Sequence, residues 1–82
     1  MKVDFENFSS ELIGVGIGLK RLEIDTLISA LQRLKEGQDH FHFRSVDYEI
    51  KSGVLDVEIY CIDNDCQDNM TIEGSPPIWP NR

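Results

Sequence analysis

The sequence predicts an α+β protein: one antiparallel sheet of four or five strands, with a single amphipathic helix packed on one face. Two observations lead to this prediction. Apolar and polar residues alternate in several short segments, which is the period of half-buried strands, and one segment among them has the helical period instead. The elements follow the order β-β-α-β-β-β, and we expect one domain over residues 1–82, with 75–82 as a proline-rich tail.

The first two strands are expected to form a hairpin. Residues 3–6 and 11–19 both alternate, and the polar residues 7–10 between them predict a turn. The second run also holds three glycines at every other position, Gly14, Gly16 and Gly18. Glycines in this pattern leave room for a close neighbour, such as the helix or an aromatic side chain.

The segment 23–36 predicts the helix. Its apolar residues form one stripe, Ile24, Leu27, Ile28, Leu31 and Leu34. Acidic residues lie in the first turn and basic ones near the end, which suits the helix dipole. Gly37 follows the last turn, where a left-handed backbone is expected.

Three further strands are expected at residues 39–44, 54–62 and 70–73. The apolar residues of 39–44 stand at odd positions, whereas those of 46–50 stand at even positions. A bulge or loop must therefore separate the two segments. In 54–62 the odd positions, including Cys61, are expected to face inward. Because one helix covers about half of such a sheet, the other face is expected to be open and to carry His40, His42, Arg44, Asp56, Glu58 and Tyr60.

The charge excludes some classes of function. Fifteen acidic residues oppose eight basic ones, a net charge of −7, and no basic residue occurs between Lys51 and Arg82. This field repels phosphate backbones, so nucleic acid is not an expected partner, whereas a basic protein is. The chain holds no apolar run that could span a membrane and no secretory signal, so we expect a cytoplasmic protein with Cys61 and Cys66 as reduced thiols.

No motif predicts a cofactor or a metal. In a dinucleotide-binding loop the third glycine follows the second by three residues, but here that position is Leu19. The Lys-Ser/Thr pair of a phosphate loop is also missing after the glycines. His40, His42, the two cysteines and nearby acids lack the paired spacing of structural zinc sites. The acidic run from Asp63 has Asp68 where a calcium loop needs glycine.

Catalysis is not expected either. His42 near Glu58 would be an acid–base pair on an open sheet, but such a surface offers no desolvated pocket to shift pKa values.

The only tryptophan, Trp79, lies in the tail among three prolines. Two alternatives remain for it: Trp79 docks onto the body, which we favour, or it is an exposed anchor for a partner.

The segment 31–43, from Leu31 through the Gly37-Gln38-Asp39-His40-Phe41-His42-Phe43 run, followed by Leu55-Asp56-Val57-Glu58-Ile59, resembles small immunity proteins of bacterial polymorphic toxin systems. In that family a helix ends in glycine and leads into a strand of this kind. The resemblance covers about residues 22–60. It implies a protein that binds and neutralises a cognate toxin inside the producing cell.

Together these features predict a small acidic protein-binding or inhibitory protein that is not an enzyme. The expected partner contacts follow the strand 54–62 and the loop after it: Asp56, Glu58, Tyr60, Asp63, Asp65 and Asp68. The alternative is a structural or assembly protein that forms homo-oligomers through an exposed strand edge.

Overall fold

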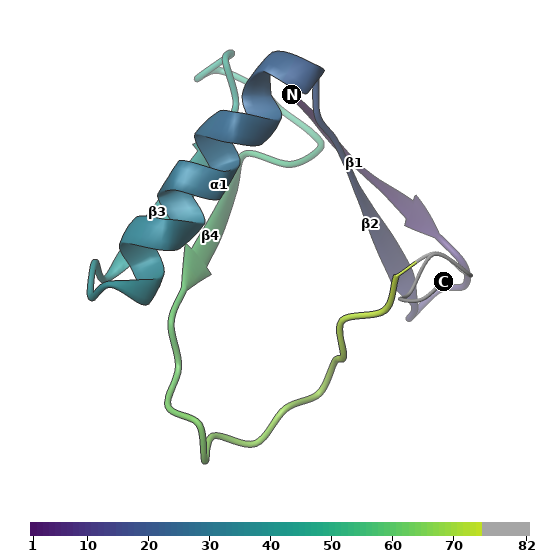
Figure 1. The fold of residues 1–82 in the computed structure, drawn as a ribbon. Coiled ribbons are helices and arrows are strands. Elements are labelled where there is room, and N and C mark those ends of the chain that lie inside the picture. Colours follow the sequence, from purple (N-terminus) through teal and green to yellow (C-terminus); the bar gives the residue numbers. More distant parts are fainter. Residues whose placement is uncertain (75–82) are drawn as a thin grey trace.

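The computed structural model describes residues 1–74, and the structural statements that follow concern these residues. Two strands, one helix and two further strands follow one another along the chain. Figure 1 shows them as two arms, with the first two strands on one side and the helix with the last two strands on the other. The tail at 75–82, and with it both alternatives for Trp79, lies outside the described residues.

The predicted hairpin is confirmed. β1 (Lys2–Asn7) pairs antiparallel with β2 (Ile13–Gly18), and the register places Val3 opposite Ile17 and therefore groups apolar residues on one face. The glycine prediction is also confirmed at Gly14. There the ring of Phe8 lies so close that a β-carbon would come within 2.7 Å of it.

The predicted helix is confirmed as α1 (Arg21–Lys35). The backbone N–H of Lys20 donates to Oε1 of Glu23 at 2.9 Å, which satisfies a donor that the helix start leaves unpaired. At the other end Gly37 has φ +118°, and the N–H of Gln38 donates to the carbonyl of Arg33 at 3.0 Å. The glycine therefore ends the helix as its position predicts.

β3 (His40–Arg44) and β4 (Asp56–Tyr60) form the second antiparallel pair. Phe41 lies opposite Ile59 and Phe43 opposite Val57, and these four side chains are half-buried. A loop joins the two strands, as the change of parity predicts. α1 lies beside β3, which places the helix and this strand pair in one arm (Figure 1).

The prediction of one sheet of four or five strands with a helix on one face is wrong. The described residues form two separate two-stranded sheets, β1–β2 and β3–β4, with no strand pairing between them. Apolar alternation shows which face of a strand avoids water. It does not show which edge pairs with which neighbour, so the periodicity could not distinguish one sheet from two.

Two local predictions in the last third of the chain are also wrong. Residues 70–73 form no strand, and the strand expected over 54–62 is limited to Asp56–Tyr60. Without pairing to the hairpin, the described chain beyond Tyr60 has no neighbouring strand to pair with. Cys61 accordingly lies past the end of β4 and is exposed rather than turned inward.

No hydrophobic side chain among the described residues is fully buried. The whole chain exposes 7703 Å², whereas a compact monomer of its mass exposes about 5,000 Å². The excess agrees with two arms whose apolar faces are only partly covered.

Candidate functional site

The polar face of the β3–β4 pair is the first element of the candidate site. Its register places three pairs directly opposite one another: His40 with Tyr60, His42 with Glu58, and Arg44 with Asp56. Because alternate residues of a strand share a face, all six lie on the side away from the phenylalanines. The sequence-based grouping of these six residues on one face is therefore confirmed.

Asp56 is the member of this face that is tied most closely to its neighbours. Its two carboxylate oxygens both lie 3.1 Å from Nδ1 of His42, and Nε of Arg44 donates to Oδ1 at 3.3 Å. The Asp56 side chain keeps 39% of its surface exposed. Such exposed pairs contribute at most about 1 kcal/mol to stability, but they compensate part of the charge that Asp56 would offer a partner.

Glu58 and Tyr60 are less engaged with their neighbours than Asp56 is. Both are exposed, Tyr60 by 61%, and within residues 1–74 Glu58 forms no ion pair. The expected pair between His42 and Glu58 exists as a cross-strand pair, but Nδ1 of the His42 ring contacts Asp56 instead. The face therefore combines a compensated carboxylate with an uncompensated one.

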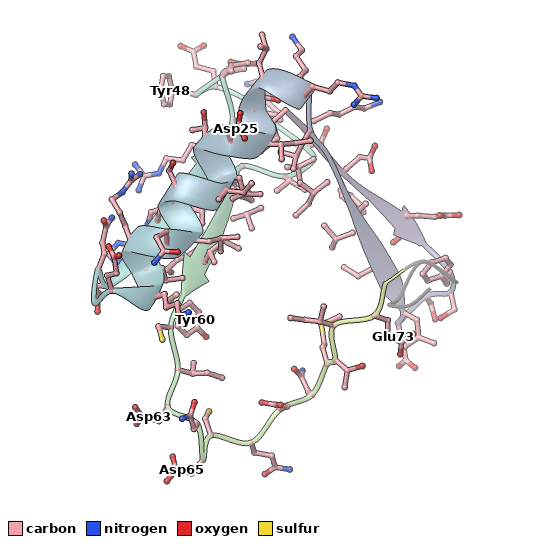
Figure 2. The ribbon with its side chains drawn as sticks, in the orientation of Figure 1. Asp25, Tyr48, Tyr60, Asp63, Asp65 and Glu73 are labelled. Atoms are coloured by element: carbon pink, nitrogen blue, oxygen red, sulfur yellow. The ribbon has the colours of Figure 1, made fainter. Side chains whose placement is uncertain are left out.

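The segment after β4 supplies the other predicted contacts. Asp63, Asp65 and Asp68 are all exposed, and none forms an ion pair within the part of the chain that the structure describes. A turn holds the segment, in which the N–H of Cys66 donates to the carbonyl of Asp63 at 3.0 Å. Figure 2 shows Asp63 and Asp65 pointing outward, below Tyr60.

A hollow between the arms is the feature that the sequence did not predict. It has a volume of about 630 Å³. Residues of β1, β3 and β4 line it, together with residues of the loop that joins β3 to β4. Apolar side chains face it from both arms, Val3 and Phe5 from one and Phe43 and Val57 from the other. The alternation indicated that these residues avoid water, but only the arrangement of the arms shows that they face an open space.

One ion pair joins the start of the chain to the helix. The ammonium of Met1 lies 2.8 Å from Oε2 of Glu23, whose other oxygen accepts from Lys20. The hydrogen bond from this ammonium, and then the one from the Lys20 backbone, hold the pKa of Glu23 below its usual 4.5. The pair links the residue before β1 to the first turn of α1, and both of its members line the hollow.

The helix α1 is too short and too polar to cross a membrane, and no other helix occurs among residues 1–74. The chain matches none of the protein-family models, none of the curated proteins and none of the solved structures with which it was compared.

Proposed function

We propose that this protein is a small acidic inhibitor that acts in the cytoplasm by binding a basic protein and performs no catalysis itself. The observation that carries this proposal is the uncompensated charge that begins on β4 and continues along the segment after it. Glu58, Asp63, Asp65 and Asp68 are exposed and unpaired within residues 1–74, and no basic residue follows until Arg82.

Exposed acidic residues of one sign accelerate the encounter with an oppositely charged protein. Tyr60 lies at the start of this acidic segment and is 61% exposed. Aromatic side chains of this kind are common at the energetic centre of interfaces. Asp56, by contrast, serves the proposed site indirectly, because His42 and Arg44 already occupy its oxygens.

The resemblance of residues 22–60 to immunity proteins of toxin systems supports the same class of function. A toxin that cleaves nucleic acid needs a basic substrate-binding surface. An acidic protein that covers this surface would inhibit such an enzyme by occupying the place of its substrate. We therefore propose a basic toxin of the same cell as the partner.

The test uses the full chain in two steps. The tagged protein first captures partners from a lysate of its host at low and at high salt, and the captured partner is then purified. The rate of association is measured for the parent chain and for the triple variant Asp63→Lys, Asp65→Lys, Asp68→Lys. We expect the association rate at low salt to fall by at least about tenfold.

A second triple variant, Asp4→Lys, Glu6→Lys, Glu11→Lys, is the matched control. It has the same net charge, but its changes lie on the hairpin, where all three side chains are exposed. If both triple variants slow association equally, total charge and not this segment determines binding, and the proposed site is wrong. A partner that binds both variants as tightly as the parent would show that neither the segment nor total charge determines binding, and the proposed site would again be wrong.

Self-association is the second candidate, and the hollow is the observation that favours it. Each of the four described strands has only one partner, so each arm also has free strand edges. A second copy is the occupant that we propose, because the excess exposed area is of the size that a stable dimer buries. Sedimentation velocity at several protein concentrations tests this candidate without any partner.

A further inference from the structure

His40, His42 and Glu58 lie together on the polar face of the β3–β4 pair. The two histidines are two residues apart on one strand, and Glu58 is directly opposite His42 on the other. One ring nitrogen of each histidine and one carboxylate oxygen of Glu58 all lie within 4.8 Å of one another. The centres of the two rings are 5.0 Å apart.

Each histidine also has a carboxylate behind it. Nδ1 of His40 lies 3.0 Å from Oδ2 of Asp39, and Nδ1 of His42 lies 3.1 Å from both oxygens of Asp56. A carboxylate at Nδ1 favours the tautomer with the proton there, which leaves the lone pair on Nε2. Metal-binding histidines in proteins almost always have such a second partner, which orients the ring and raises its basicity.

The donor set selects the class of ion. Two imidazoles with one carboxylate suit zinc and related divalent transition metals, and three protein ligands leave a fourth position for water. Ligand atoms around a tetrahedral zinc ion with bonds of 2.0–2.1 Å lie about 3.3 Å apart. The side chains of His40 and Glu58 are exposed, so small rotations can bring the three donors from 4.8 Å to this spacing.

The charges around the three side chains also favour a cation. Asp39, Asp56 and Glu58 face the two rings, whereas Arg44 is the one permanent cation among the β3–β4 residues. Arg44 is bound to Oδ1 of Asp56 rather than to Glu58. The carboxylate that would bind the ion directly therefore remains uncompensated.

We propose that His40, His42 and Glu58 bind one divalent transition-metal ion, with Zn²⁺ as the first candidate, and that Asp39 and Asp56 orient the two histidines. The ion would join β3 to β4 at a face that otherwise depends on exposed ion pairs. The proposal does not depend on a protein partner.

The experiment is titration of the purified chain with ZnSO₄ alone, followed by calorimetry and by NMR of the histidine rings. The chain has only two histidines, so both ring signals are identifiable and both must shift as one equivalent binds. We expect His42→Gln and Glu58→Gln each to weaken binding by more than about tenfold, and Asp56→Asn to weaken it by about 10- to 100-fold.

The double variant Cys61→Ser, Cys66→Ser is the matched control, because both thiols are exposed and are the rival ligands for zinc. We expect it to bind zinc as the parent chain does. Loss of binding in this variant, or saturation by zinc with unchanged histidine signals, would assign the ion to the thiols and overturn the proposal. Absence of any saturable binding to the parent chain would also overturn it.

Discussion

Replacing Phe43 by Asp provides a sharp test of self-association through the hollow. Phe43 faces the hollow from β3 and is half-buried in the single chain. Two open chains expose about 15,400 Å² together, whereas a compact body of twice the mass exposes about 8,300 Å². A dimer that closed both hollows completely would bury at most the difference of about 7,100 Å², and a stable obligate dimer needs only about 2,000–5,000 Å² of it.

The expected loss of dimer affinity follows from the additional burial that Phe43 would gain in the dimer. Full burial of a phenylalanine contributes about 1.5–3 kcal/mol, so the remaining half contributes about 1 kcal/mol. A carboxylate in its place would lose its hydration without a partner, which costs at least about 2 kcal/mol more. The sum of about 3 kcal/mol corresponds to a dissociation constant raised by at least about 100-fold, and a symmetric dimer repeats the loss in both copies.

Sedimentation velocity over a wide range of protein concentrations is the assay, with circular dichroism to verify that the helix persists. Tyr48→Asp is the matched control, since Tyr48 is 84% exposed and does not line the hollow. We expect the parent and the control to sediment as dimers and Phe43→Asp to sediment as a monomer. A parent chain that stays a 9.4 kDa monomer at every concentration would refute the reasoning, as would equal effects of the two substitutions.

Two further predictions concern the ends of α1. Because the ammonium of Met1 lowers the pKa of Glu23, the carboxylate stabilises the fold above pH 4.5 and this contribution is lost as the pH falls below it. Urea unfolding of Glu23→Gln should therefore show reduced stability at neutral pH and a difference from the parent that shrinks in acid; a constant difference would contradict the ion pair. Gly37→Ala should cost about 1–2 kcal/mol in the same assay, because φ is +118° there although no atom lies within 4 Å of the added carbon. Gly18→Ala is its control and should be nearly neutral, since its added carbon meets only ordinary contacts from 3.8 Å; equal losses in both variants would mean that backbone strain is not the cause.

Much of the local structure could be predicted because its causes are local. The helix was predicted from its apolar stripe and from Gly37, and the hairpin from alternation on both sides of a polar turn. The same parity placed His42, Asp56 and Glu58 on one face of the second strand pair. In each case the preference belongs to residues within a few positions of one another or to the pleat of a single strand.

The candidate site was predicted only in part. The exposure of Asp63, Asp65 and Asp68 follows from a polar run that cannot form a core, and the structure agrees with it. The engagement of Asp56 by His42 and Arg44 could not be predicted, because it depends on which residue of one strand lies beside which residue of the other. Strand register depends on pairing across a loop, and the sequence of either strand alone leaves it open.

The amino-acid sequence by itself determined the helix and the positions of the four strands that form, the apolar face of each of these strands and the excess of acidic residues in the last third of the chain. Only the tertiary structure decided that the strands form two pairs instead of one sheet, that Val3 and Phe43 face a shared hollow, and that His40, His42 and Glu58 converge. The physical reason is the range of the interactions. Periodicity and charge are properties of neighbouring residues, whereas strand edges, hollows and ligand clusters arise when distant segments meet and their pairing competes with alternatives of similar energy.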